Sequence, residues 1–171
     1  MKKIFALILT VLTLLALVSC GNGVPDGMTP ASGENDPFLF YVPKSWSPNQ
    51  SGGIASAIFS SSDRSNVSVT AVMMEENFST LDDYIAAFPE KLKSVLPDIE
   101  ITTGITDTTL GGIEARQFDY SGTIDGTNYM YRQVVCARSG YFYVFTYTST
   151  AENFESHLTD TEYMLKEFSF K

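Results

Sequence analysis

The sequence predicts an α+β domain in which a central antiparallel sheet of about six to seven strands is packed by helices. Two observations predict this fold class. Strand-like runs separated by tight-turn dipeptides recur through most of the chain. Two other segments show the three- and four-residue apolar spacing of amphipathic helices. The order is roughly β-β-β-α-β-β-β-β-α, and its many hairpins favour an antiparallel sheet covered by helices.

Three strands are expected before the first helix, over residues 38–42, 54–60 and 66–74. The first is strongly apolar and ends at Pro43. In the third, Val67 and Val69 alternate with Ser68 and Thr70. This alternation is typical of a strand with one buried face and one polar face.

The first helix is expected over residues 80–96. Thr80 can cap its N-terminus, and Asp82 and Asp83 in the first turn suit the helix dipole. Pro89 should kink this helix or split it in two. The apolar spacing predicts one buried stripe, made of Leu81, Tyr84, Ile85, Phe88, Leu92, Val95 and Leu96.

Four more strands are expected over residues 99–110, 113–121, 129–138 and 141–149. Gly111-Gly112, Asp125-Gly126 and Ser139-Gly140 mark the tight turns between them. The last segment, 151–168, is expected to be helical, and a capping box at 159–162 could restart the helix there. Its expected buried face is Phe154, Leu158, Met164, Leu165 and Phe168.

The N-terminus has the features of a secretory signal. Lys2 and Lys3 precede an apolar run over 4–18, which is shorter than the roughly 20 residues of a transmembrane helix. Leu17-Val18-Ser19-Cys20 resembles the lipobox of bacterial lipoproteins. That resemblance implies a signal peptide over 1–19 and a diacylglycerol thioether on Cys20, with acyl chains such as palmitate anchoring the protein to the membrane.

Two further segments complete the expected organisation. Residues 20–37 are rich in Gly, Pro, Asn, Ser and acids, and predict a lipidated flexible linker. Residues 38–171 form the single α+β domain. The expected location is the extracytoplasmic face of the cell membrane, with the lipid on Cys20 as the membrane contact.

Charge and cysteine content narrow the possible functions. Loss of residues 1–19 leaves nine basic and 20 acidic residues, a net charge of −11. This balance argues against nucleic-acid binding, which needs clustered Lys and Arg. With Cys20 lipidated, Cys136 has no disulfide partner, and its apolar strand predicts a buried free thiol.

Three stretches resemble the superfamily typified by the photosystem II extrinsic protein PsbP. They are the strand-Pro-Trp pattern of Phe40–Trp46, the Gly-then-aromatic strand Leu110–Tyr120, and the closing strand and helix from Tyr143. The similarity covers about residues 38–171. It implies an α/β/α sandwich around an antiparallel sheet. It also implies a non-catalytic role, because the known members mostly bind other proteins.

Residues that could carry catalysis or bind metal are few. The sequence has no Gly-x-Ser-x-Gly elbow, and its one histidine, His157, is expected to be exposed on the final helix. The metal-related histidines of PsbP therefore have no counterpart. The carboxylate pairs Glu75-Glu76 and Asp82-Asp83 are not expected to converge. No cofactor, metal site or catalytic residue is predicted.

Aromatic residues occupy alternate positions along each of the two strands of the Ser139-Gly140 hairpin. Such a set can form cross-strand core contacts or an exposed binding face. The residues are Tyr129, Tyr131, Tyr141, Tyr143, Phe145 and Tyr147.

The sequence favours a lipid-anchored, extracytoplasmic domain that binds or scaffolds another envelope protein. The alternative is a module that binds a small ligand or a cell-wall glycan. A hydrolase built on distant carboxylates is the third hypothesis.

Overall fold

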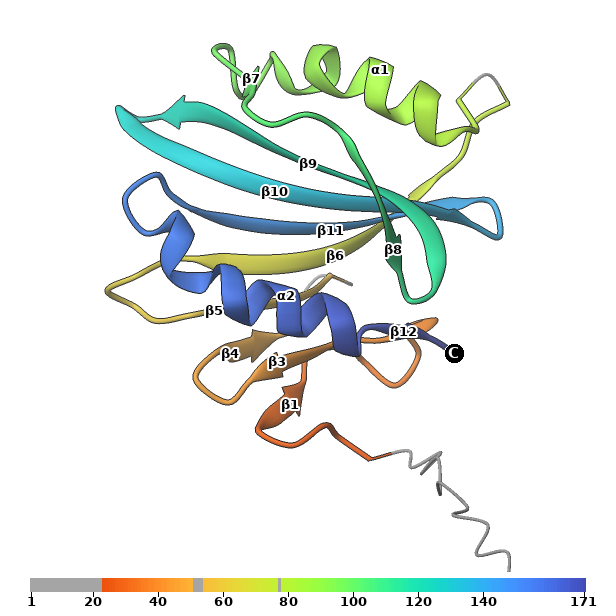
Figure 1. Ribbon diagram of the computed structural model, residues 1–171, viewed down its shortest axis with the longest axis vertical. Helices are drawn as coiled ribbons and strands as arrows, with labels where there is room; N and C mark the ends of the chain where they lie inside the picture. Colours follow the sequence, from red (N-terminus) through yellow and green to blue (C-terminus); the bar gives the residue numbers. More distant parts are fainter. Residues whose placement is uncertain (1–22, 51–53, 77) are drawn as a thin grey trace, which may run out of the picture.

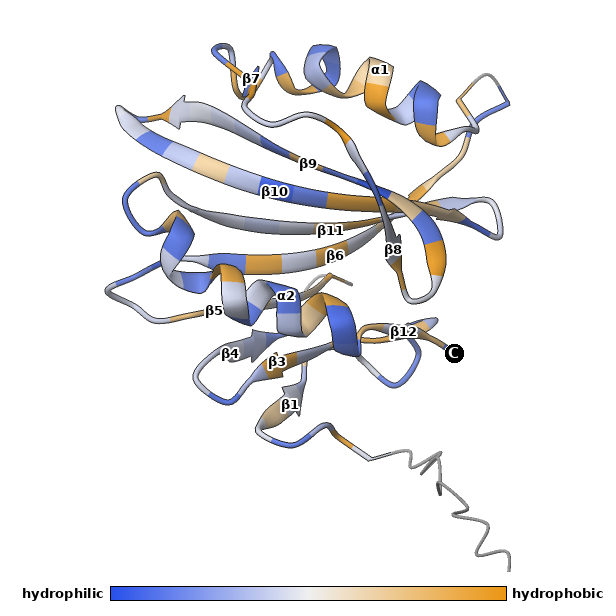
Figure 2. Cartoon of the chain, in the orientation of Figure 1, coloured by the Kyte–Doolittle hydropathy of each residue, from blue (hydrophilic) through white to orange (hydrophobic). Residues whose placement is uncertain are grey.

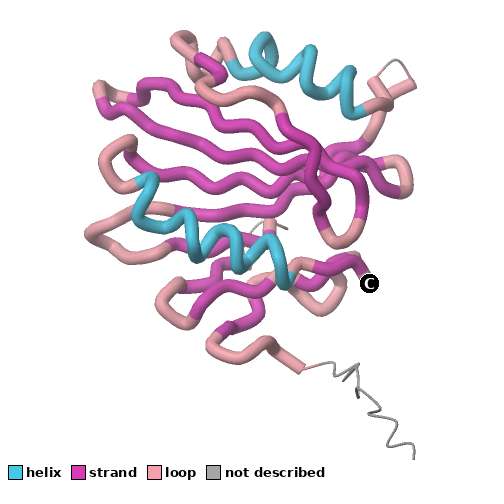
Figure 3. The backbone as a smooth tube through the Cα atoms, in the orientation of Figure 1, coloured by secondary structure: helices cyan, strands magenta, loops and turns pink. Residues whose placement is uncertain are grey.

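An eight-stranded antiparallel sheet runs through the centre of the molecule, with one helix on each face (Figures 1 and 3). The computed structural model describes residues 23–50, 54–76 and 78–171. The sheet order is β4-β5-β6-β11-β10-β9-β7, and β8 also pairs with β9. The predicted fold class is confirmed.

The strand count exceeds the expected six to seven because short strands lie at both edges. The strands are β4 (Ser47–Asn49), β5 (Ala55–Ile58), β6 (Asn66–Met73), β7 (Glu100–Ile101), β8 (Thr106–Leu110), β9 (Ile113–Ile124), β10 (Thr127–Arg138) and β11 (Tyr141–Thr150).

The predicted hairpins join the longest strands. Asp125-Gly126 connects β9 to β10, and Ser139-Gly140 connects β10 to β11. Both residues of each turn have positive φ, 50° and 78° in the first turn and 51° and 81° in the second. Two-residue turns of this kind match the twist of the flanking strands.

Within the described residues, β-structure is present earlier in the chain than expected. β1 (Met28–Pro30) pairs with β3 (Tyr41–Pro43), and Met28 and Ala31 are buried. β2 (Phe38–Leu39) pairs instead with the C-terminal β12 (Ser169–Phe170). The segment expected as the first strand thus lies outside the main sheet, and the second half of the expected linker is part of the fold.

α1 (Leu81–Leu92) packs on one face of the sheet. The Thr80 side chain accepts a hydrogen bond from the Asp83 backbone, and the Asp83 carboxylate bonds back to the Thr80 backbone. This capping box confirms the predicted N-terminus. Pro89 lies inside one continuous helix, so of the two predicted outcomes, a kink or a split, the split does not occur. Val95 lies beyond the helix and is exposed, contrary to expectation.

The opposite face carries the larger part of the core. There η2 (Phe154–His157), a 3-10 helix, leads into α2 (Leu158–Glu167). The predicted buried face of this segment is confirmed, with Leu158 and Leu165 partly buried. The capping box at 159–162 is not formed, because these residues lie within α2, whose N-cap is His157.

The two faces follow from alternation along the strands. Figure 2 shows hydrophobic bands separated by paler or hydrophilic ones along β6. Val67 and Val69 of β6 lie in the core beneath α2, whereas Ser68 and Thr70 point to the face of α1. The predicted half-polar strand is therefore confirmed.

Candidate functional site

The predicted lipid-attachment residue, Cys20, lies outside the described residues, as does the predicted signal peptide over 1–19. In the part of the chain that the structure describes, no helix has the length and apolarity to cross a membrane. Lipidation of Cys20 stays a prediction.

The aromatic hairpin divides between the two faces of the sheet. Tyr131 pairs with Thr148 and stacks on Tyr120 beneath α1, with ring centroids 4.5 Å apart. Tyr143, Phe145 and Tyr147 of β11 are buried on the opposite face. Core packing is thus the reading that the structure supports, and no continuous aromatic binding face forms from this hairpin.

His157 is not the exposed helix residue that the sequence predicted. Its side chain is only 8% exposed. Its Nε2 lies 2.8 Å from a carboxylate oxygen of Asp63, and its ring packs 4.2 Å from that of Phe59. The Asp63 carboxylate also accepts from Ser65. This pair ties the β5–β6 turn to the start of α2, and the rings of Trp46 and Phe59 pack against the His157 imidazole.

The other titratable candidates have structural roles. Cys136 is fully buried as predicted, and burial raises the pKa of its thiol to about 11, which makes it unreactive. Glu75 and Glu76 are exposed, and Asp83 caps α1. Within the described ranges, no three His, Cys, Asp or Glu side chains gather in a way that could hold a metal ion.

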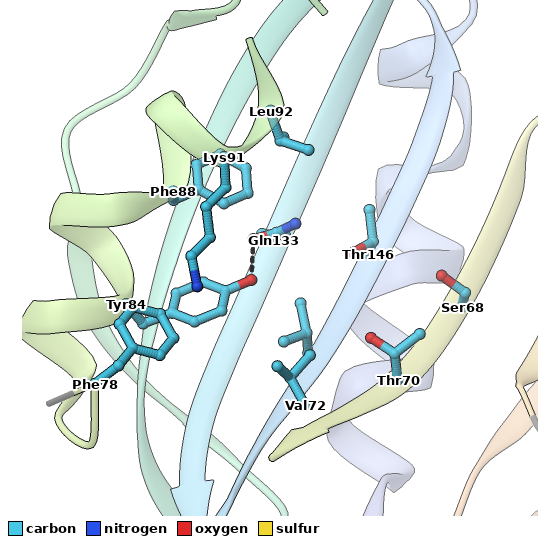
Figure 4. Close-up of a pocket in the computed structure, with 11 residues that line it drawn as sticks. Ser68, Thr70, Val72, Phe78, Tyr84, Phe88, Lys91, Leu92, Gln133 and Thr146 are labelled. Atoms are coloured by element: carbon cyan, nitrogen blue, oxygen red, sulfur yellow. Dashed lines mark hydrogen bonds between the residues drawn. The ribbon is translucent and has the colours of Figure 1, made fainter. Parts of the chain in front are cut away.

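The strongest candidate site is a groove beside α1, which the sequence analysis did not identify. α1 covers β9 and β10 but leaves much of β5 and β6 open on the same face. At this boundary lies a cavity of about 300 Å³. Its floor carries the hydroxyls of Ser68 and Thr70 from β6 and Thr146 from β11 (Figure 4).

The wall of the groove is aromatic. Tyr84 and Phe88 of α1 stack one turn apart, with ring centroids 6.1 Å apart. The Tyr84 hydroxyl donates to the Gln133 amide oxygen at 3.3 Å, and the Gln133 amide nitrogen donates to the Tyr120 hydroxyl. Burial raises the pKa of Tyr84, which keeps its hydroxyl a neutral donor.

One positively charged side chain, that of Lys91, lies at the mouth of the groove. The Lys91 ammonium lies 3.6 Å from the centre of the Phe78 ring, and its side chain runs along the wall past Tyr84 (Figure 4). No Asp or Glu lines this cavity. The groove thus offers a flat apolar wall, neutral hydrogen-bonding groups and one positive charge, an arrangement suited to binding small molecules.

A row of polar side chains leads from the open face into the groove. Strand register places Ser56 opposite Ser68, Ser68 opposite Thr146, and Thr146 opposite Gln133. Neighbouring strands lie about 4.8 Å apart, which sets the spacing of this row. The signal was present in the Ser and Thr residues alternating with valines in β6. This alternation indicates a binding site only if the helix leaves that half of the sheet uncovered.

No protein-family model matches the chain, and a search of curated proteins finds no match. Solved structures do match it. Cyanobacterial PsbP (CyanoP) from Synechocystis sp. PCC 6803 is 15% identical, covers 91% of this chain and 99% of its own, and has a TM-score of 0.59. LpqN of Mycobacterium tuberculosis, described as involved in cell envelope biogenesis, is 18% identical, with coverages of 84% and 90% and a TM-score of 0.56.

The Ran-binding protein Mog1p of Saccharomyces cerevisiae is 9% identical, with coverages of 84% and 95% and a TM-score of 0.59. At such identities the likeness concerns the fold alone. The central antiparallel sheet with one helix on each face, together with these neighbours, shows that the domain has a PsbP-like fold.

Proposed function

We propose that this protein is a lipid-anchored envelope protein whose PsbP-like domain binds another protein without catalysing a reaction. The lipobox-like sequence ending at Cys20 is the observation that carries the location. The structural neighbours support the role, since one is named for cell envelope biogenesis and another for binding Ran.

The open half of the α1 face supports a binding role. Ile58 and Val72 are large apolar residues that remain 47% and 41% exposed there. They flank the polar row that contains Ser68. An apolar and hydroxyl-rich sheet face that no helix covers is a suitable contact surface for a partner.

The anchor is tested by replacing Cys20 with Ala. We expect the wild-type protein to pellet with membranes and to enter the detergent phase, because two or more acyl chains give stable anchoring. The Cys20→Ala protein should become soluble after processing. Its continued recovery with membranes after the signal peptide has been cleaved would contradict lipid anchoring.

Partner binding is tested by photocrosslinking in intact envelopes, with the crosslinker at position 72. The matched control carries it at the exposed Glu152, on the turn between β11 and η2. A discrete adduct from position 72 but not from 152 supports the proposal. Equal or absent adducts at both positions contradict this face as the contact surface.

A second candidate function is the binding of a small ligand or glycan, and the groove beside α1 favours it. A ligand that binds only the folded state raises the melting temperature. A thermal-shift screen of envelope-derived small molecules and glycan fragments would therefore detect it. A screen without any shift would favour the protein-binding role alone.

A further inference from the structure

The geometry points to the groove beside α1 as a site for a small, ring-containing carboxylate, held by its ring against Tyr84 and by its charge near Lys91. This inference deepens the second candidate function and rests on it. It names the class of ligand and the residues that select it.

Shape and apolar surface select the ring. Tyr84 and Phe88 present aromatic surface to a cavity of about 300 Å³, at the small end of the range for ligand pockets. Phe88 is itself held edge-on against Phe118, with centroids 5.0 Å apart. The wall is therefore preformed, and a flat ring could pack on it without ordering a loop.

Charge selects the carboxylate. Lys91 is the one fully charged residue among those lining the cavity. No described carboxylate pairs with it, whereas the neighbouring Glu90 pairs with Lys93. The Lys91 ammonium lies over the Phe78 ring, and this cation–π contact leaves it able to bond an anion. In a chain of net charge −9, a ligand site lined by a cation and no acid favours an anion.

The floor completes the site with neutral groups. The hydroxyls of Ser68, Thr70 and Thr146 can each donate to a ligand oxygen or accept from a ligand hydroxyl. Gln133 is held by Tyr84 and Tyr120, which fixes the orientation of its amide at the inner end. A ligand with ring hydroxyls or carbonyls would therefore gain hydrogen bonds on this side.

The test uses 2-naphthoate and its uncharged counterpart 2-naphthylmethanol, titrated into the folded domain by calorimetry, with amide shifts followed by NMR. We expect naphthoate to bind at least about tenfold more tightly than the alcohol. Its shifts should centre on Thr70 and Thr146. Lys91→Met should remove the preference, whereas Lys93→Met, the same charge change at the C-cap of α1, should retain it.

The outcomes separate the ligand class from the site. Equal binding of both probes, or full retention of the preference in Lys91→Met, overturns the carboxylate class while leaving the groove as a binding site. Absence of binding by both probes overturns the inference as a whole. Thr146→Phe fills the floor and should abolish binding of both probes, and its circular dichroism spectrum and melting temperature confirm that it folds.

Discussion

The two faces of the sheet differ in how completely they are covered. Under α2 the core is continuous, and the polar groups on this face are paired. The Trp46 indole donates to the Asp160 carboxylate at 2.8 Å, and Arg132 makes a bidentate ion pair with Asp119. Under α1 the core is smaller and stops where Ser68 and Thr70 face the groove. The comparison teaches that one face is closed by a continuous core, whereas the other leaves apolar and hydroxyl-bearing surface uncovered.

The largest expected effect lies under α2. Trp46→Ala removes a side chain that is 2% exposed and leaves the Asp160 carboxylate without its indole donor. We expect a loss of about 4 kcal/mol in the free energy of unfolding, measured by urea denaturation. Phe88→Ala on the α1 face should cost about 3 kcal/mol, because the open groove lets its surroundings relax. A greater loss at Phe88 would break the comparison.

The next largest loss of stability is expected where β9 contacts Leu96, which follows α1 in the chain. A Cβ on Gly122 would clash with Cγ of the buried Leu96. We therefore expect Gly122→Ala to cost about 1–3 kcal/mol through overpacking. Gly104→Ala is the control, because its Cβ would meet no atom within 4 Å. Equal thermal stability of the two variants would show that Leu96 yields without cost.

The Asp63–His157 pair makes the α2 side sensitive to acid. Burial raises the pKa of Asp63, but hydrogen bonds from Ser65 and His157 outweigh it and lower the pKa to about 2. A lowered carboxyl pKa stabilises the fold above the unfolded value of 3.8 and loses that effect as the pH falls through about 2.

Asp63→Asn should thus cost about 1–2 kcal/mol at pH 7, and the difference should shrink between pH 4 and pH 2. Urea denaturation across this range measures it, with the surface variant Glu152→Gln as control. A difference that is independent of pH would mean that the pair contributes packing rather than charge.

The smallest expected effect is local to α1. Thr80→Ala removes the capping box and should cost about 1 kcal/mol. Amide hydrogen exchange should quicken in α1 by about fivefold and stay unchanged in α2. The exposed Ser156→Ala provides the control. Faster exchange in both helices would indicate that the two faces unfold together and would weaken the contrast drawn between them.

The sequence predicted most of what depends on near neighbours. Asp125-Gly126 and Ser139-Gly140 marked two hairpins, and Thr80 marked the start of α1. What it missed depends on distant contacts. Asp63 and His157 are 94 residues apart, so nothing near His157 indicated that it would be buried.

The groove was missed for a related reason. The Ser and Thr residues of β6 were recognised as a polar face, but that face becomes a site only where α1 stops short of it. The position of a helix over a sheet follows from the packing of its whole buried stripe, and Phe88 against Phe118 and Tyr120 sets that position here.

The pairing of β1 with β3 limits how far the domain could stand from a lipid attached to Cys20. The expected linker of 18 residues over 20–37 would extend to roughly 60 Å, at about 3.5 Å for each residue. Because Met28 is already buried in the fold, a chain anchored at Cys20 has eight steps left, about 28 Å at full stretch. Under the proposed anchoring, the domain would be confined to a thin layer above the lipid and would meet a ligand or partner by searching a surface rather than a volume.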